Sequence, residues 1–301
     1  MKASIGAITR NGGSVDISRV GVVGCGLMGS GIAEIAAKSG FDVVVREVND
    51  ELLEKGKGRI RKSMDRAVEK EKLSAEDRDT AWARLSFTTA VPDLAGCDLV
   101  VEAIIEELEA KHALFRELDG LCGEGTIFAS NTSSLTITDM AAATNRADRF
   151  VGLHFFNPVP VMKLVEVVRT IATSEATFER AFAFSKALGK VPIAAKDNSG
   201  FVVNLLLVPY MLDAITHLER GVASIEDIDT GMALGCGYPM GPFMLCDFVG
   251  IDTLYQISEI MFDEYREQRY APPPLLKRIV AMGRYGRKTG MGFYDWSGEK
   301  P

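Results

Sequence analysis

The chain has 301 residues, of which 47% are hydrophobic and 25% are charged, a composition that excludes a fibrous or intrinsically disordered protein. Its length predicts about two domains. The formal net charge of −7 argues against nucleic acid or an anionic membrane as a partner, because both bind positively charged surfaces.

Cysteine usage and the N-terminal sequence indicate the compartment. The five cysteines show neither CxxC pairs nor the Cys/His spacing of a metal site, so we expect no disulfide framework and no bound metal. Residues 1–17 contain no apolar stretch of signal-peptide length, and the apolar segment FVVNLLLVPYML is interrupted by Asn204 and Pro209, which argues against a membrane span. We expect a soluble, cytoplasmic protein that begins with a flexible arm over residues 1–17.

A glycine cluster follows the first expected strand. In RVGVVGCGLMGSG, which starts at residue 19, three glycines lie between a β-branched run and a helical pattern. The spacing is typical of a dinucleotide-binding turn: the first glycine permits the turn, the second admits a pyrophosphate and the third lets the helix pack on the sheet. The helix N-terminus adds partial positive charge. The residues predicted to bind the cofactor here are Gly24, Gly26, Leu27, Met28 and Gly29.

Glu47, which ends the next β-branched run, sets the expected choice of cofactor. A carboxylate at the end of the second strand binds ribose hydroxyls and repels a 2′-phosphate, which favours NAD over NADP. Arg46 lies directly beside it and leaves NADP possible. The alternative for the whole motif is a tight strand–helix turn without a ligand.

Further strands alternate with helical segments along the chain. The expected strands occupy residues 84–89, 98–104, 126–131, 150–156 and 163–168. This alternation predicts an α/β fold with a mostly parallel, doubly wound Rossmann-type sheet. The long charged stretch 52–83 is expected to form two helices that project from this sheet.

The segment HFFNPVPVMKLVEVV, residues 154–168, contains one of the three histidines and a glutamate inside an apolar run. Taken singly, His154 is more often a core side chain, and Glu166 is more often an edge-strand charge that faces water. The double-proline segment 157–160 can, however, reverse the chain and bring the strand of Glu166 beside that of His154. A carboxylate fixes the tautomer of an imidazole, whose other nitrogen can then accept a proton. Together the two residues predict a general base.

Two more polar side chains are candidates for the same site. SNTSSL, residues 130–135, follows an expected strand at its carboxyl end, where doubly wound sheets bind ligands, and it presents Ser133. Asn204 lies in an otherwise apolar helix start, where a polar residue requires a partner. The alternatives are a helix cap for Ser133 and a helix–helix hydrogen bond for Asn204.

Strand patterns end after GKVPIAAKDNSG, residues 189–200, and amphipathic helices follow. The expected helices span residues 201–220, 224–235, 242–266 and 273–283, with Ser224 as the cap of the second. We therefore expect a dinucleotide-binding domain over residues 18–196 and an all-α domain over residues 197–301.

Several motifs occur in order between residues 19 and 296: GCGLMGSGIAE, SNTSSL, HFFNPVPVMKLVEVV, SGFVVNLLLVPYMLDAI, GYPMGPFMLCDFVGIDT and GRKTGMGFYDW. Together they resemble the 3-hydroxyacyl-CoA dehydrogenase family, in particular its stand-alone 3-hydroxybutyryl-CoA dehydrogenases. The resemblance implies reversible hydride transfer between a nicotinamide cofactor and C3 of a short-chain (S)-3-hydroxyacyl-CoA. It implies that His154 is the general acid/base and Glu166 its orienting partner. It also implies that Ser133 and Asn204 contact the C3 oxygen.

The resemblance implies further contacts. Those to the cofactor are at Glu106, Lys111, Asn157 and Lys288, and those to coenzyme A are at Ser63 and Lys70 of the projecting helices. The same helices carry a cationic excess at Lys55, Lys57, Arg59, Arg61, Lys62, Arg66, Lys70 and Lys72. These side chains can meet the phosphates of coenzyme A, or they can lie on a solvated face balanced by neighbouring acids. The chain departs from the family at Leu205, where an arginine is common, and at Glu47, where an aspartate is common.

Two other functions stay open at this point. One is a 3-hydroxyacid dehydrogenase that acts on free acids, a chemistry that commonly uses a lysine of the helical domain where this chain has Asn204. The other is a non-catalytic, crystallin-like nucleotide-binding protein, against which the complete set of site residues argues. The resemblance further implies a homodimer formed through the helical domain.

Overall fold

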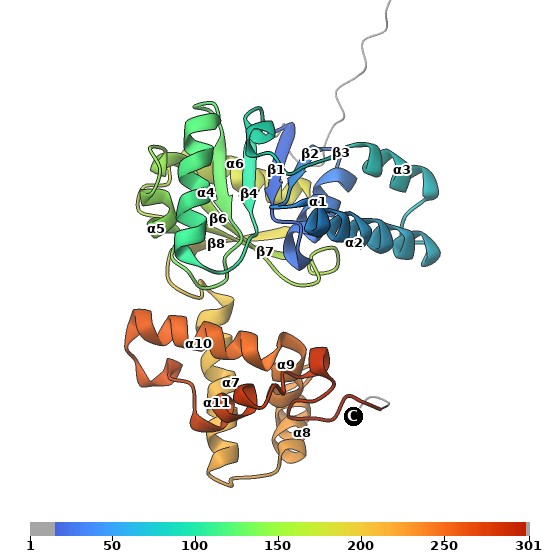
Figure 1. The fold of residues 1–301 in the computed structure, drawn as a ribbon. Helices are drawn as coiled ribbons and strands as arrows, with labels where there is room; N and C mark the ends of the chain where they lie inside the picture. Colours follow the sequence, from blue (N-terminus) through green and yellow to red (C-terminus); the bar gives the residue numbers. More distant parts are fainter. Residues whose placement is uncertain (1–15, 299–301) are drawn as a thin grey trace, which may run out of the picture. The chain divides into compact units, whose positions relative to one another are not determined.

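A computed structural model describes residues 16–298 of the chain (Figure 1). The residues form two compact units: the first contains the described residues up to Thr132 together with Thr136–Asp197, and the second contains Ser133–Leu135 and the chain from Asn198 on. Of the expected arm over residues 1–17, residues 1–15 lie outside the described part. Ile17 is 2% exposed and belongs to the core of the first unit.

The first unit is built on one sheet of eight strands in the order β3-β2-β1-β4-β5-β6-β7-β8. The strands are β1 (Arg19–Val23), β2 (Asp42–Arg46), β3 (Leu85–Thr88), β4 (Leu99–Glu102), β5 (Ile127–Ser130), β6 (Phe150–Phe155), β7 (Leu164–Arg169) and β8 (Val191–Lys196). All neighbours are parallel except β6 and β7, which are antiparallel. The predicted doubly wound, mostly parallel sheet is therefore confirmed. Its strand order reverses at β1, and ligands of such sheets bind beyond the carboxyl ends of the strands at this point.

The helices of the first unit lie between its strands in sequence (Figure 1). They are α1 (Leu27–Lys38), α2 (Asp50–Glu69), α3 (Ala75–Ala83), α4 (Leu108–Leu121), α5 (Ile137–Ala142) and α6 (Glu175–Ala187), with short 3₁₀ turns at Val91–Leu94 and Ala147–Arg149. The helix pair predicted within residues 52–83 is present as α2 and α3, which extend beyond the β3 edge of the sheet in Figure 1. Asn49 and Ser74 cap these helices by accepting the amides of Leu52 and Asp77, each at 2.9 Å.

The central strands are buried on both faces because helices cover both sides of a doubly wound sheet. All four residues of β4 and of β5 are buried, as are all six of β6. Three aromatic rings, those of Phe115, Phe128 and Phe150, fill the space under α4, with centroids 4.6 Å apart for Phe115 and Phe150. This close packing holds the carboxyl ends of the strands, where a ligand would bind, in fixed positions.

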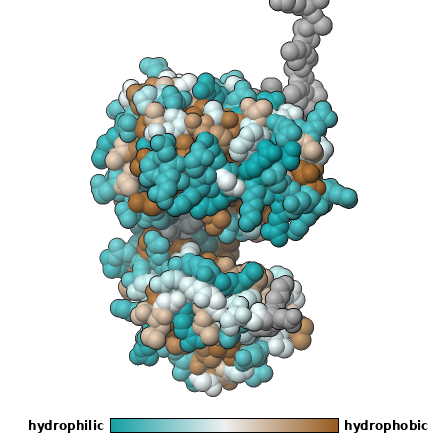
Figure 2. Space-filling model, turned by 45° about the vertical axis from the view of Figure 1, so that its right-hand side comes forward, coloured by the Kyte–Doolittle hydropathy of each residue, from teal (hydrophilic) through white to brown (hydrophobic). Residues whose placement is uncertain are grey.

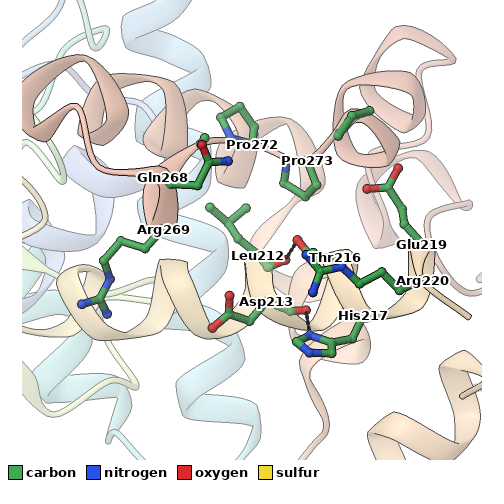
Figure 3. A pocket seen from close by; sticks show the side chains of 12 residues that line it. Leu212, Asp213, Thr216, His217, Glu219, Arg220, Gln268, Arg269, Pro272 and Pro273 are labelled. Atoms are coloured by element: carbon green, nitrogen blue, oxygen red, sulfur yellow. Dashed lines mark hydrogen bonds between the residues drawn. The ribbon is translucent and has the colours of Figure 1, made fainter. Parts of the chain in front are cut away.

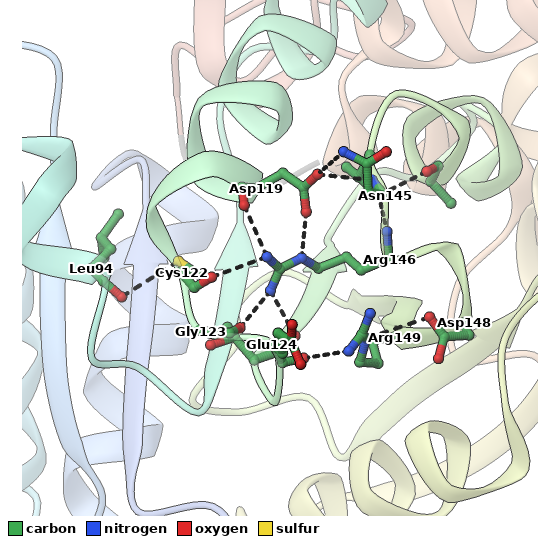
Figure 4. A network of polar contacts seen from close by, with 12 residues as sticks. Leu94, Asp119, Cys122, Gly123, Glu124, Asn145, Arg146, Asp148 and Arg149 are labelled. Atoms are coloured by element: carbon green, nitrogen blue, oxygen red, sulfur yellow. Dashed lines mark hydrogen bonds and ion pairs between the residues drawn. The ribbon is translucent and has the colours of Figure 1, made fainter.

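A buried arginine joins α4 to the strand that follows it (Figure 4). Arg146 is 5% exposed. Its Nε donates to Asp119 Oδ1 at 2.5 Å, and its terminal nitrogens donate to the carbonyls of Gly123 at 2.8 Å and Cys122 at 3.1 Å. The guanidinium also lies over the Phe128 ring, 4.5 Å from its centroid. Because every one of these groups is a strong partner for a guanidinium, the charge is well compensated inside the protein.

The second unit is helical, with an apolar core of its own. Its helices are α7 (Val203–Glu219), α8 (Ile225–Cys236), α9 (Pro242–Val249), α10 (Ile251–Tyr265) and α11 (Pro274–Ala281), with 3₁₀ turns at Gln268–Tyr270 and Arg287–Thr289. The predicted cap of α8 is present, because Ser224 accepts the Asp227 amide at 3.1 Å. The single helix expected over residues 242–266 is wrong. Gly250 has φ +101°, a value outside the helical range, and it divides α9 from α10.

Two buried carboxylates hold the C-terminal segment to this helical core. Asp229 accepts the Phe243 amide at 2.8 Å and the Tyr294 hydroxyl at 2.9 Å. Asp247 accepts the Tyr294 amide at 2.9 Å and the Trp296 indole N–H at 2.8 Å. All of these donors are neutral. The two carboxylates are therefore stabilised by hydrogen bonds from backbone N–H groups, the Tyr294 hydroxyl and the Trp296 indole.

The surface of the first unit is largely hydrophilic on the face seen in Figure 2. None of the helices within residues 16–298 combines the length and the apolar character needed to cross a membrane. All five cysteines are present as free thiols, four of them buried, and the described residues contain no cluster of side chains that could hold a metal ion.

Candidate functional site

The glycine loop between β1 and α1 has the geometry that a dinucleotide requires. Gly24 has φ +93°, and a Cβ at that position would lie 2.5 Å from the Ala103 carbonyl oxygen. A Cβ on Gly29 would lie 1.8 Å from the Gly24 oxygen, whereas one on Gly26 would meet no atom within 4 Å. The first and third glycines are thus required for packing, and the second leaves open space above the loop.

The start of α1 is suited to an anionic group. Gly26 is its N-cap, no side chain caps it, and its first turn, which begins at Leu27 and Met28, contains no acidic residue. Backbone N–H groups at such a helix start attract phosphate. Leu27 is 64% exposed, so this turn is accessible within the first unit. The loop therefore fits the pyrophosphate of a dinucleotide.

Glu47 is held in place beside this loop. Its Oε2 accepts the Cys25 amide at 2.8 Å, and its Oε1 accepts the Val48 amide at 2.7 Å. The loop is also tied to the end of β2, because the Gly24 amide donates to the Arg46 carbonyl at 2.9 Å. The carboxylate thus lies at the loop itself, and its contact with a ribose stays a prediction.

His154 and Glu166 face each other across β6 and β7, whose register pairs these two residues. His154 Nδ1 lies 2.6 Å from Glu166 Oε2, and the two residues are 4% and 0% exposed. The chain reversal that the double-proline segment predicts is therefore confirmed. The bond orients the imidazole through Nδ1, and proton exchange at the other ring nitrogen, Nε2, stays a prediction. The ring also contacts that of Phe156, with centroids 4.5 Å apart.

The other two histidines have different surroundings. His112 Nε2 lies 3.1 Å from the Asp139 carbonyl oxygen, and His217 Nδ1 lies 2.7 Å from the Asp213 carbonyl oxygen. His217 lines a pocket of the second unit between α7 and the segment that precedes α11, together with side chains of both charges such as Asp213, Arg220 and Arg269 (Figure 3). None of the residues predicted for the site lines this pocket.

A buried polar network, which was not predicted from the sequence, connects the ends of β4 and β5. Glu102, at 0% exposure, accepts Lys111 Nζ at 2.6 Å and Ser130 Oγ at 2.6 Å. Lys111, at 1% exposure, also lies 3.1 Å from Glu106 Oε2. The structure thus places the predicted cofactor residues Lys111 and Glu106 together in an ion-pair network. A direct contact of either with a cofactor stays a prediction.

Asn131 extends this network toward the histidine. Its amide donates to the Glu102 carbonyl at 2.9 Å, and its side-chain oxygen accepts the Phe155 amide, next to His154, at 2.9 Å. Asn157 lies two residues after Phe155, on the exposed turn between β6 and β7. The signal for Asn131 was present in SNTSSL, since an asparagine directly after a buried strand needs a partner.

Ser133 and Asn204 belong to the second unit, and the structure brings them together. Asn204, in the first turn of α7, donates from Nδ2 to the Ser133 carbonyl at 3.3 Å. Ser199 supports the same loop by donating to the Ser134 carbonyl at 2.6 Å. The alternative role of Ser133 as a helix cap is wrong, because α5 begins at Ile137 and its first amides donate to Asp197 at 2.7 and 2.6 Å.

Lys288 also belongs to the second unit. Its ammonium forms an ion pair with Asp252 of α10 and lies 5.6 Å from the centroid of the Tyr285 ring. The lysine is 46% exposed at its side chain. Its predicted contact with the cofactor stays a prediction.

Helix α2 presents the predicted coenzyme A residues. Ser63 is partly buried on it, and Lys70 is its exposed C-cap. Several cations of the helix are neutralised locally, as in the pairs Lys55–Glu51 at 2.6 Å and Lys57–Glu54 at 2.5 Å. In contrast, four exposed cations form no ion pair within the described residues. Arg59 donates from Nη1 to the Cys25 carbonyl at 3.3 Å, and the other three are Lys62, Arg66 and Lys70. Their spacing of four residues puts them on one face of the helix, which we call the α2 cationic stripe.

These features define a class of protein. A doubly wound sheet, a glycine loop with open space at its second glycine and a fixed carboxylate at the end of β2 are the elements of a dinucleotide-binding oxidoreductase domain. The oriented imidazole of β6 is the kind of group that can act as a general acid/base on an alcohol or ketone, and this role of His154 stays a prediction.

Comparison with known proteins identifies the family. Residues 19–198 match the family model for the NAD binding domain of 3-hydroxyacyl-CoA dehydrogenase, and residues 200–296 match the model for its C-terminal domain. The 3-hydroxybutyryl-CoA dehydrogenase of Mycobacterium tuberculosis (strain ATCC 25618 / H37Rv) is 49% identical over 93% of this chain and 99% of its own. The human mitochondrial hydroxyacyl-coenzyme A dehydrogenase is 50% identical over 93% of this chain and 91% of its own. The chain belongs to the 3-hydroxyacyl-CoA dehydrogenase family.

Solved structures agree with this assignment. The crystal structure of FadB2 from M. tuberculosis matches with a TM-score of 0.92 and 49% identity, covering 93% of this chain and 99% of that one. The (S)-3-hydroxybutyryl-CoA dehydrogenase PaaH1 from Ralstonia eutropha matches with a TM-score of 0.90 and 46% identity, covering 94% of this chain and 100% of that one. The resemblance seen in the sequence motifs is confirmed.

Proposed function

We propose that the protein is an NAD-dependent (S)-3-hydroxyacyl-CoA dehydrogenase that interconverts 3-hydroxybutyryl-CoA and acetoacetyl-CoA. The single observation that carries this proposal is the buried pair of His154 and Glu166, 2.6 Å apart at Nδ1 and Oε2. The relatives named 3-hydroxybutyryl-CoA dehydrogenase, 44 to 49% identical over most of this chain, support the short-chain substrate.

The glycine loop and Glu47 are the residues that would hold the cofactor. NAD, when bound, supplies the hydride acceptor for C3 of the substrate, and NADH the donor in the reverse direction. The open position above Gly26 and the uncapped start of α1 accommodate the pyrophosphate. Two backbone amides hold the Glu47 carboxylate in place, so it cannot easily move aside to relieve its repulsion of the 2′-phosphate of NADP. This supports NAD over NADP.

His154 moves the proton of the reaction. In the oxidation direction its Nε2 accepts the C3 hydroxyl proton as the hydride leaves, which avoids a high-energy protonated ketone. General-base assistance of this kind contributes about 10² to 10⁴ in rate. Glu166 accepts Nδ1–H, keeps the ring in one orientation and stabilises the imidazolium. We assign to Ser133 and Asn204 the binding of the C3 oxygen, where partial negative charge develops.

The coenzyme A moiety of the substrate is assigned to helix α2. The α2 cationic stripe offers three exposed charges in a protein whose net charge is −7. Phosphate groups are the natural partners of such a stripe. Ser63 lies one residue after the first of these cations and can donate a hydrogen bond to the same ligand.

An absorbance assay tests the function. NADH should be consumed on addition of acetoacetyl-CoA, and the rate with NADPH should be lower. Acetoacetate, as the free acid, should give a much lower rate than the thioester. Faster turnover of the free acid would support a 3-hydroxyacid dehydrogenase, and binding of NADH without turnover of either substrate would support a non-catalytic protein.

We also infer a homodimer in a reducing compartment such as the cytoplasm. The second unit exposes large apolar side chains, among them Leu206 at 67%, Leu234 at 82% and Met282 at 76%. Apolar residues of this size are often covered in an assembly. Sedimentation equilibrium on the full chain measures the state directly. The five free thiols support a compartment in which thiols stay reduced.

A further inference from the structure

Glu102 has no role in the mechanism described above, yet it lies where the strand order reverses. It is the last residue of β4, and its register partners are Val23 of β1 on one side and Ser130 of β5 on the other. Val23 directly precedes the glycine loop, and Ser130 directly precedes Asn131. A side chain at this point can act on both neighbouring segments.

The first segment that Glu102 holds is the one against which the glycine loop packs. Glu102 Oε1 accepts the Ile104 amide at 2.8 Å. A Cβ on Gly24 would lie 2.5 Å from the Ala103 oxygen and 3.2 Å from the Ile104 nitrogen. The carboxylate therefore fixes the backbone surface on which the loop rests.

The second segment is the one that leads to Ser133. Glu102 Oε2 accepts Ser130 Oγ at 2.6 Å, and that Oγ accepts the Thr132 amide at 3.2 Å. The Glu102 carbonyl accepts the Asn131 amide at 2.9 Å. Asn131 in turn bonds the backbone beside His154, as described above. One buried residue is thus connected to the cofactor loop and to the strand of the general base.

The charge of Glu102 is balanced without the help of a ligand. Lys111 Nζ lies 2.6 Å from its carboxylate and 3.1 Å from Glu106 Oε2. If Glu102 became glutamine, Lys111 would still pair with Glu106, so no isolated charge would be left buried. The amide would keep the shape of the side chain. A glutamine variant should therefore fold.

We propose that Glu102 is a positioning residue that sets the spacing between the segments after β4 and β5, and thereby the fit of the nicotinamide cofactor. We expect loss of the Glu102 carboxylate to weaken cofactor binding more than it affects the stability of the fold. The inference rests on the proposed function for the identity of the ligand, NADH.

The test measures NADH affinity by the change of NADH fluorescence on binding, in the full chain and without substrate. Glu102→Gln should weaken NADH binding by at least about fivefold, and Ser130→Ala should weaken it by a smaller factor. The double variant should lose less than the product of the two factors, because both changes act through one contact. The control is Glu34→Gln, which alters a carboxylate of α1 that is 2% exposed and pairs with Lys38 at 3.3 Å.

Each outcome decides the question. The inference is overturned if Glu102→Gln binds NADH within about twofold of the parent, as expected of Glu34→Gln, whether or not its melting temperature falls. If Glu102→Gln does not fold, Ser130→Ala decides in the same way, since it deletes one hydroxyl. A parent chain that binds no NADH would refute the proposed function instead, so the two failures are distinguishable.

Discussion

His154 and Glu166 form a buried pair, 2.6 Å apart at Nδ1 and Oε2, between the only two antiparallel neighbours of an otherwise parallel sheet within the described residues. Because β7 runs antiparallel to β6, Glu166 lies directly opposite His154 in the register of the two strands. A parallel connection would have needed a long crossover before the chain came back. The short turn therefore produces the pair directly from adjacent sequence.

The first prediction concerns this pair. His154→Gln should lower kcat for acetoacetyl-CoA reduction by more than about a hundredfold, because it removes the general acid. NADH affinity, measured by fluorescence, should stay within about twofold, since the glycine loop is untouched. A variant that keeps kcat within roughly tenfold of the parent would exclude His154 from the role.

Glu166→Gln gives the second prediction. The amide keeps the size of the side chain but removes the charge that stabilises the imidazolium, so kcat should fall by about ten- to a hundredfold, less than for His154→Gln. Combining the two substitutions should cost little more than His154→Gln alone, because the glutamate acts through the histidine. Steady-state rates of the single and double variants check this, and independent, multiplying effects would contradict it.

The third prediction separates the two cofactors at Glu47. Glu47→Ala should raise the KM for NADH by roughly tenfold, since the ribose contact is lost, while the KM for NADPH should fall or stay unchanged as repulsion disappears. Arg46→Ala is the matched control beside it. Equal weakening of both cofactors in Glu47→Ala would show that Glu47 supports the loop through Cys25 without selecting between them.

The α2 cationic stripe leads to the fourth prediction. Replacing Lys62 and Arg66 together by glutamine should raise the KM for acetoacetyl-CoA by roughly three- to tenfold, a modest factor because exposed charges are screened. The KM for acetoacetyl-pantetheine, which lacks the phosphates, should not change. Lys55→Gln is the control, because Lys55 is on the same helix but pairs with Glu51 at 2.6 Å. Equal changes for both thioesters would place the phosphates elsewhere.

The fifth prediction concerns acid stability and the Arg146 network (Figure 4). Burial raises the pKa of Asp119, but hydrogen bonds from Asn145 and Arg146 outweigh this effect and leave the pKa below its usual value. A carboxyl with a lowered pKa contributes stability above its unfolded pKa of about 3.9 and loses it as the pH falls toward the folded pKa. Asp119→Asn should therefore lower the free energy of unfolding by about 3 kcal/mol at pH 7, and the difference from the parent should shrink below about pH 4.

Urea unfolding at both pH values measures this difference. The control is Asp148→Asn, which removes an exposed pair with Arg149 at 3.4 Å and should change the free energy of unfolding by less than about 1 kcal/mol. A difference between Asp119→Asn and the parent that stays constant with pH would contradict the explanation.

The sheet could be predicted because its residues carry the signal themselves. Strands buried on both faces contain continuous β-branched runs, and glycines at 24, 26 and 29 between a strand and a helix are typical of a dinucleotide-binding turn. The pairing of His154 with Glu166 followed from the short distance in sequence and from the proline turn. These features are local, so a single sequence contains them.

Other features depend on neighbours far along the chain and could not be predicted. Glu102 reads as the polar end of a strand, and only the register of β4 with β1 and β5 shows that three segments converge on it. The buried acids Asp229 and Asp247 find their donors in the C-terminal segment, 65 and 47 residues away at Tyr294. The break at Gly250 had a local signal, but a glycine within an apolar helical pattern is often tolerated.

The assignment of Ser133–Leu135 to the second unit has a topological consequence. The backbone leaves the first unit after Thr132, returns at Thr136 and leaves again after Asp197, so three covalent crossings connect the units where a simple tandem arrangement has one. Cleavage of the peptide bond between Asp197 and Asn198 would therefore not release a helical fragment freely. Residues Ser133–Leu135 would remain hydrogen-bonded to the helical fragment through Asn204 and Ser199. The N-terminal and C-terminal fragments should therefore co-migrate until denaturant separates them.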